Sequence, residues 1–123
     1  VFVALAEEGW TSTDATREVA RAYLGPLFSG PQKPDTLVLG CTHFPVLLEA
    51  IRAELPGGVT IVDSASTTAQ AVAATLDDAS AAPAGQKGTV RFLATDGPER
   101  FARVGRIFFG SDIDAGAITT IDL

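Results

Sequence analysis

Short apolar runs alternate along this chain with longer stretches in which apolar residues recur at helical spacing. The short runs are typical of strands, and they lie at residues 1–6, 37–39, 59–62, 90–94 and 118–123. The longer stretches predict amphipathic helices at residues 14–28, 46–55, 67–76 and 99–109. This alternation predicts an α/β fold with a mostly parallel sheet and right-handed crossovers.

Capping residues and helix breakers set the bounds of these helices, and the apolar spacing sets the side that faces the core. N-cap residues cluster at 11–14, and Pro45 suits a first helical turn, where its missing N–H would have had no partner. Residues 56–58 and Gly110 end two of the helices. The residues predicted to face the core are Ala15, Val19, Ala22 and Tyr23, then Leu47, Leu48, Ile51 and Leu55, then Ala69, Val72, Ala73 and Leu76, and finally Phe101, Val104 and Phe108.

Residues 79–88 differ from the rest in being rich in Ala, Ser, Pro and Gly without any periodicity. This composition predicts a linker between residues 1–78 and a group of C-terminal elements at 89–123. The sequence starts at Val1, inside an apolar run and without an initiator Met. We therefore expect it to be part of a longer polypeptide.

The single cysteine and the single histidine stand two residues apart, between a predicted strand and a predicted helix. Gly40 ends the strand, Cys41, Thr42 and His43 follow it, and Phe44-Pro45 open the helix. In open α/β sheets, ligands bind at the carboxyl ends of strands. A helix N-terminus also favours an anion such as a thiolate or a substrate carboxylate. The pattern therefore indicates a candidate catalytic site.

Each of these residues also has a structural interpretation, which the pattern leaves open. A lone cysteine is often a small buried hydrophobic residue, and a lone histidine is often a hydrogen-bonded structural one. Thr42 could serve as a helix cap. The carboxylates of Glu7 and Glu8 could belong to a solvated turn.

Composition narrows the classes of function. With 46% hydrophobic and 20% charged residues the chain is globular, and its net charge of -6 argues against nucleic acid or an anionic membrane as a partner. One cysteine excludes an internal disulfide and a cysteine-based metal site, and it fits a reducing compartment. The sequence has no apolar run as long as a membrane span, no signal-peptide pattern and no glycine-rich nucleotide loop.

The seven residues from Leu39 to Pro45, Leu-Gly-Cys-Thr-His-Phe-Pro, resemble the second catalytic-cysteine motif of glutamate racemases. Residues 2–9 resemble the segment upstream of that motif, although the family more often has proline where Ala4 stands. Residues 61–65 resemble the strand and turn that follow it. The resemblance covers essentially the whole chain but only the C-terminal half of such an enzyme. It implies an aspartate/glutamate racemase-like fragment of a two-domain, pseudo-symmetric fold, in which residues 1–78 belong to the second domain and 89–123 pack on the missing first domain.

The resemblance also implies an activity, namely the interconversion of L- and D-glutamate by two cysteines without PLP or a metal. Such an enzyme is cytoplasmic and supplies D-glutamate for peptidoglycan. By position, Cys41 would be the base facing the α-proton of L-glutamate, and His43 would tune it, relay its proton and contact the substrate. Thr42 would hold the substrate carboxylate. Glu7 aligns with a carboxylate near the active site.

The resemblance further implies two partners, glutamate and the missing N-terminal half, which carries the other cysteine; a homodimer remains open. We expect no nucleic-acid or membrane partner, and no activity from the 123 residues alone. The alternatives are an aspartate or hydantoin racemase, a hydrolase with a Cys-His nucleophile, and a non-catalytic fragment in which Cys41 is inert.

Overall fold

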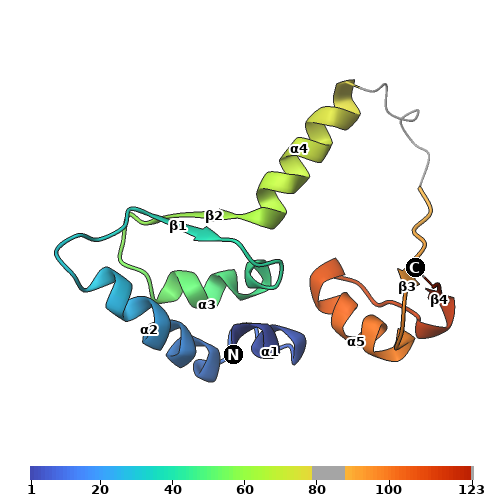
Figure 1. Cartoon of the computed structure of the whole chain (residues 1–123), viewed down its shortest axis with the longest axis horizontal. Coiled ribbons are helices and arrows are strands. Elements are labelled where there is room, and N and C mark those ends of the chain that lie inside the picture. Colours follow the sequence, from blue (N-terminus) through green and yellow to red (C-terminus); the bar gives the residue numbers. More distant parts are fainter. Residues whose placement is uncertain (79–87, 123) are drawn as a thin grey trace. The chain divides into compact units, whose positions relative to one another are not determined.

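The computed structural model of this chain describes residues 1–78 and 88–122. Two compact units divide the chain, Val1–Ala81 and Ala82–Leu123, which we call the N-terminal unit and the C-terminal unit (Figure 1). The predicted linker at 79–88 lies, except for Gly88, outside the described residues.

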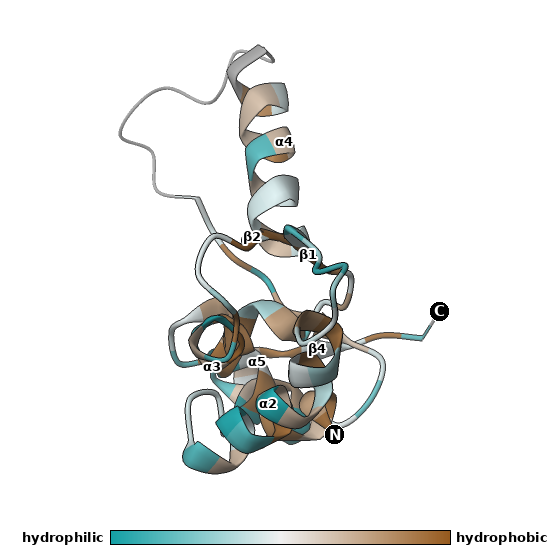
Figure 2. Ribbon diagram, turned by 90° about the vertical axis from the view of Figure 1, so that its left-hand side faces the viewer, coloured by the Kyte–Doolittle hydropathy of each residue, from teal (hydrophilic) through white to brown (hydrophobic). Residues whose placement is uncertain are grey.

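The N-terminal unit consists of a small parallel sheet with helices on one side. Its elements in order are α1 (Phe2–Glu7), α2 (Asp14–Phe28), β1 (Thr36–Leu39), the 3-10 turn η1 (Phe44–Leu47), α3 (Leu48–Ala53), β2 (Thr60–Asp63) and α4 (Ser64–Asp78). Strands β1 and β2 pair in parallel, with Leu37 opposite Ile61 and Leu39 opposite Asp63. Helices α2 and α3 lie together on one side of the strands (Figures 1 and 2). The predicted α/β architecture with parallel strands is confirmed.

The core of this unit lies between that sheet and the helices. Leu47 and Ile51, one helical turn apart, are completely buried there. The rest of the buried cluster comes from α1, α2 and the end of β1, and it comprises Phe2, Ala6, Ala20, Leu24, Phe28 and Leu39. Leu37 and Ile61 pack on this cluster from the two strands.

The prediction of a strand at residues 1–6 is wrong, because this segment forms the helix α1. A short, continuously apolar run does not distinguish a strand from a buried helical turn. Here Phe2 and Ala6, four residues apart, fall on one helical face and enter the core. The residues between them include good helix formers. The ring of Phe2 packs edge-on against Phe44 and Tyr23, at 5.5 Å between ring centroids in both cases.

Helix α2 has the predicted bounds but a different buried face. Its N-cap is Thr13, whose side chain accepts a hydrogen bond from the Thr16 N–H. The buried residues are Thr16, Ala20, Leu24 and Phe28, whereas Ala15, Ala22 and Tyr23 are exposed and Val19 is half-buried. The Thr16 hydroxyl donates to the carbonyl of Trp10, so a polar residue is buried with its hydrogen bond satisfied. The core face is therefore shifted by one residue.

The two later helices of the unit also differ from prediction. The helix expected at 46–55 begins as the turn η1 and continues as α3 to Ala53. Of its predicted core residues, Leu48 and Leu55 are only partly buried. The carboxylate of Glu54, just after α3, is 12% exposed and pairs with Arg21 of α2.

Helix α4 extends beyond the predicted range of 67–76, and its predicted core face is exposed, with Val72 at 51% and Leu76 at 54%. Its main neighbour among the described elements is β2, the strand that it follows.

The C-terminal unit is built on one helix and a short parallel ladder. It contains β3 (Leu93–Ala94), α5 (Pro98–Phe109), a 3-10 turn η2 (Ala115–Ala117) and β4 (Thr119–Thr120). The predicted strands at 90–94 and 118–123 shrink to two-residue strands, which pair in parallel. Helix α5 lies between Gly97 and Gly110, both with positive φ, as its start and stop signals predict. Ala94, Ala102 and Ile118 form the buried cluster, whereas Phe108, predicted to face inward, is 40% exposed.

Within residues 1–78 and 88–122, no helix combines the length and the apolar character needed to cross a membrane.

Candidate active site

The Cys-Thr-His sequence forms the turn between β1 and η1. Strand β1 ends at Leu39, and the backbone N–H of Phe44 donates to the carbonyl of Cys41 at 3.1 Å, which closes the turn. His43 is the N-cap of η1, which places Pro45 in the first turn of that 3-10 helix. Cys41 is a free, half-buried thiol at the carboxyl end of a parallel strand. The predicted position of these residues is therefore confirmed, although a 3-10 turn, and not the first turn of an α-helix, follows them.

Glu7 contacts His43 across 36 positions of sequence. The Nε2 atom of His43 lies 3.3 Å from Oε1 of Glu7, and the two side chains are 27% and 26% exposed. Glu7 is the last residue of α1, so the change from a predicted strand to a helix decides where this carboxylate lies. Partial burial strengthens such a contact relative to one in open water, because less solvent screens it. When Nε2 carries a proton, it donates to the carboxylate and holds the imidazole in one orientation.

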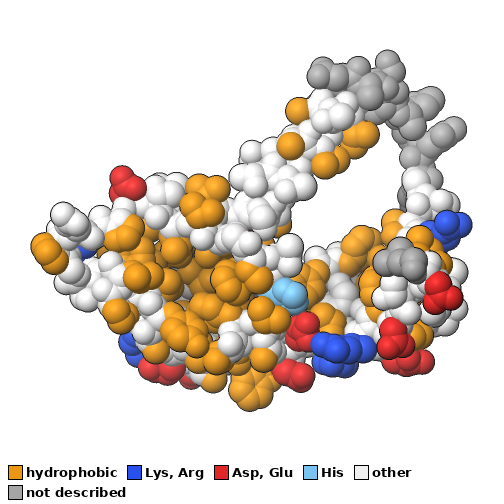
Figure 3. All heavy atoms as spheres, viewed as in Figure 1, with side chains coloured by type: hydrophobic (Ala, Val, Ile, Leu, Met, Phe, Trp, Pro, Cys, Tyr) orange, Lys and Arg blue, Asp and Glu red, His pale blue; other side chains and the backbone are white. Residues whose placement is uncertain are grey.

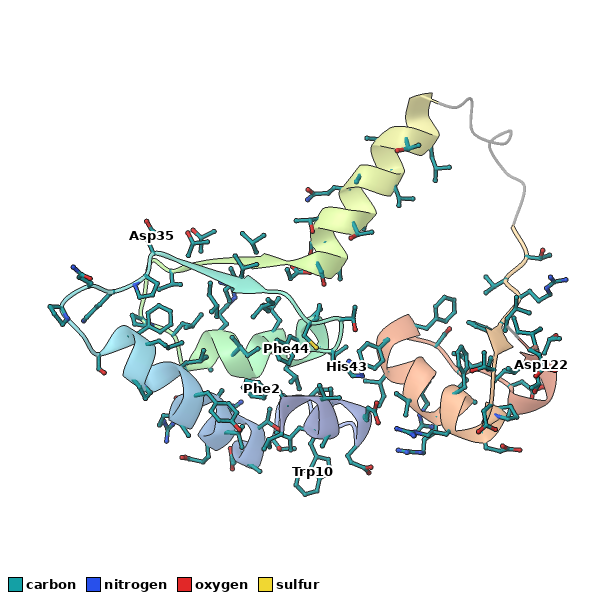
Figure 4. The ribbon with its side chains drawn as sticks, in the orientation of Figure 1. Phe2, Trp10, Asp35, His43, Phe44 and Asp122 are labelled. Carbon is teal, nitrogen blue, oxygen red and sulfur yellow. The ribbon has the colours of Figure 1, made fainter. Side chains whose placement is uncertain are left out.

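Packing between two aromatic rings holds these elements together. Phe2, at the start of α1, contacts Phe44, which directly follows His43, with the ring planes at 73°. The side-chain view shows Phe2, Phe44 and His43 close to one another where α1 meets the turn (Figure 4). The apolar packing thus fixes α1 against η1 and keeps Glu7 within reach of His43.

Thr42 borders a hollow at the carboxyl ends of both strands. The hollow has a volume of about 440 Å³, and the start of α4 lines its other side with Ser64, Ala65, Thr68 and Ala69. Because Leu39 and Asp63 stand opposite each other in the ladder, the chain leaves both strands at the same edge and brings Thr42 near Ser64. This edge is where parallel sheets bind ligands.

Asp63, the last residue of β2, directly precedes α4, the helix that lines this hollow. Its Oδ1 accepts a hydrogen bond from the backbone N–H of Ser66 at 2.8 Å. That hydrogen bond holds the pKa of the Asp63 carboxyl below its usual value, because it stabilises the charged form. The Asp63 side chain therefore caps the start of α4. An Asp before a helical run is the signal that identifies this cap.

The described residues contain no group of three or more His, Cys, Asp or Glu side chains that could hold a metal ion. The structure thus brings together His43 and Glu7, keeps Cys41 and Thr42 on the same turn, and places Thr42 at the hollow.

Comparison with known proteins relates this arrangement to one family, although no protein-family model matches the chain. The glutamate racemase of Koribacter versatilis is 37% identical over 137 residues, which cover 93% of this chain and 47% of that protein. The chain thus spans about half the length of the curated relatives that it matches.

Two solved structures show the same similarity in three dimensions. The glutamate racemase of Thermus thermophilus, in complex with β-chloro-D-alanine, superposes with a TM-score of 0.81 at 36% identity, covering 99% of this chain and 45% of that one. The glutamate racemase of Francisella tularensis, in complex with D-glutamate, superposes with a TM-score of 0.77 at 26% identity, covering 99% and 44%. This chain has the fold of the corresponding part of a glutamate racemase.

Proposed function

We propose that this chain is one part of a glutamate racemase, and that Cys41 is one of its two catalytic bases. The observation that carries the proposal is the Cys-Thr-His turn at the carboxyl end of β1, next to the His43–Glu7 contact, in a chain similar to glutamate racemases along nearly its whole length.

The reaction is a transfer of the α-proton between the two faces of glutamate. The Cys41 thiolate takes the proton from Cα of L-glutamate, so an S–H bond forms as the C–H bond breaks and the electron pair stays on carbon. A second thiol on the opposite face then donates its proton to that carbon and gives D-glutamate. In the reverse direction the two sulfur atoms exchange roles. The second thiol lies outside this chain, which contains one cysteine. Neither step calls for a cofactor.

His43 and Glu7 support the thiolate in this proposal. The thiolate, not the thiol, is the nucleophile and base, and an imidazole on the same turn can accept and return its proton. The carboxylate of Glu7, 3.3 Å from Nε2, fixes the orientation of the imidazole. His43 thereby tunes Cys41, relays its proton and contacts the bound substrate, while Glu7 acts through His43 as a positioning residue.

Thr42 holds the α-carboxylate of the substrate through its hydroxyl and backbone N–H. Its place at the edge of the hollow supports this role, because a ligand there lies at the carboxyl ends of both strands. The remaining part of the polypeptide, with the second cysteine, closes the other face of glutamate. In this proposal the enzyme works in the cytoplasm, where its D-glutamate supplies peptidoglycan synthesis.

The test is deuterium incorporation from solvent at Cα of L- and D-glutamate, measured by NMR on the longer polypeptide that includes the upstream coding sequence. We expect exchange with glutamate, and its loss in Cys41→Ala. Ser29→Ala, which removes a hydroxyl at the end of α2, serves as the matched control and keeps full exchange.

Other outcomes separate the alternatives. Exchange with aspartate or a hydantoin but not with glutamate would retain the cysteine mechanism and change the substrate. A trapped acyl-enzyme without α-exchange would indicate a hydrolase. Exchange that persists in Cys41→Ala would contradict the role of this cysteine.

A further inference from the structure

A third aromatic ring joins the Phe2–Phe44 pair that holds α1 against the Cys-Thr-His turn. Tyr23 of α2 also contacts Phe2, with the ring centroids 5.5 Å apart and the ring planes at 82°. Both neighbours therefore meet Phe2 edge-on, which is an arrangement that aromatic rings favour because the edge of one ring is positive and the face of the other is negative. Phe2, itself buried, thus links α2 to the turn.

Tyr23 differs from the other two rings in its exposure. Half of its side chain, 51%, is open to solvent, so its burial contributes less to the stability of the unit than that of Phe2. Leu27, one helical turn further along α2, is exposed to a similar extent, at 55%. The contact of Tyr23 with Phe2 is what separates these two outward-facing residues. Loss of the Tyr23 ring should therefore affect the placement of Phe2 more than the stability of the fold.

The placement of Phe2 decides how closely Glu7 approaches His43. Phe2 and Glu7 are the two ends of the short helix α1, and Phe44 directly follows His43. If Phe2 turned into the space left by Tyr23, α1 would move relative to the turn. The Nε2–Oε1 distance of 3.3 Å is near the outer limit of a hydrogen bond, so a small shift would end this contact. Figure 3 shows the single histidine, in pale blue, at the surface beside hydrophobic side chains.

We propose that Tyr23 is a positioning residue, which acts through Phe2 to hold Glu7 and His43 together for the transfer of the α-proton. This inference rests on the proposed function, because it concerns a reaction in which His43 takes part. It goes further in giving a role to a half-exposed residue of α2, a helix that supplies none of the side chains assigned to the reaction.

The experiment measures kcat and KM for deuterium exchange at Cα of glutamate in the longer polypeptide. We expect Tyr23→Ala to lower kcat about tenfold, because a misplaced acid–base group slows the chemical step. KM should stay unchanged, since Thr42 still holds the substrate carboxylate. Tyr23→Phe keeps the ring and should restore kcat. Leu27→Ala, which truncates the similarly exposed neighbour, is the matched control and should keep full kcat.

A double variant separates positioning from a general structural effect. If Tyr23 acts only through the contact of Glu7 with His43, the double variant Tyr23→Ala/Glu7→Gln should be no slower than Glu7→Gln alone. Losses that multiply in the double variant would overturn the proposal. So would an unchanged kcat in Tyr23→Ala, or an equal loss in Leu27→Ala.

NMR of the longer polypeptide gives a readout that does not depend on activity. We expect nuclear Overhauser effects between the ring protons of His43 and the methylene protons of Glu7 in the wild type and in Tyr23→Phe. Tyr23→Ala should lose them. This pattern without exchange of glutamate in the wild type would reject the racemase and retain Tyr23 as the residue that positions the pair. Exchange in the wild type, with the effects unchanged in Tyr23→Ala, would do the reverse.

Discussion

The contact between His43 and Glu7 unites side chains that lie far apart in the sequence and come from different elements. Either residue alone has an ordinary structural explanation. Their approach to 3.3 Å, next to the turn with the only cysteine, supports the roles that we propose for both.

Replacing Glu7 tests this interpretation directly. Glu7→Gln keeps the shape of the side chain and removes its charge, so the contact that orients the His43 imidazole is weakened. In the longer polypeptide we expect α-exchange to lose part of the about 10²–10⁴-fold that acid–base groups typically supply.

Glu49→Gln provides the control, since it removes the carboxylate of an exposed residue of α3. It should not change the rate. Equal effects of the two substitutions would mean that Glu7 contributes only general negative charge.

In the N-terminal unit, local sequence signals decide where a helix begins and ends, whereas core packing decides which of its faces is buried. An N-cap within residues 11–14 and the end at Phe28 were predicted, because capping depends on residues adjacent in sequence, and the structure selects Thr13. The buried face of α2 was not, because the hydrogen bonds of Thr16 with the loop before the helix allow a polar residue to enter the core. Because α2 has alanines on several sides, the spacing of its apolar residues does not identify which of two neighbouring faces is buried.

A matched pair of leucine substitutions measures this difference between buried and exposed elements. Leu47→Ala removes a completely buried side chain and should destabilise the N-terminal unit by about 2–5 kcal/mol. Leu76→Ala on α4, where the leucine is 54% exposed, should change stability by less than about 0.5 kcal/mol.

Urea unfolding followed by the fluorescence of Trp10, the only tryptophan, reports on this unit. An equal loss of stability in both variants would mean that Leu76 is buried in solution, as Leu47 is, and would contradict the exposure of α4.

The whole molecule presents surfaces that isolated elements do not explain. Helix α4 exposes Val72 and Leu76, and the sheet exposes Val38 and Val62 on the side away from the core. The packing of residues 89–123 on the missing first domain remains a proposal of the same kind. All of these features fit a chain that spans less than half of its structural relatives.

The activity of the separate chain follows from this incompleteness. With one cysteine and one side of the substrate site, the 123 residues should give no detectable deuterium incorporation at Cα of either glutamate enantiomer. The longer polypeptide, assayed at the same concentration, is the positive control. Exchange by the short chain alone would show that a second cysteine is not required.

Locally determined features of this protein were accessible from the sequence. The Cys-Thr-His turn at a strand end, the bounds of α2 and the stop of α5 at Gly110 depend on neighbouring residues, whose steric and hydrogen-bonding preferences act within a few positions. Only the tertiary structure decided that residues 2–7 are helical, which face of α2 is buried, and that Glu7 meets His43. These outcomes depend on which distant side chains fill the same core, and apolar periodicity does not contain that information.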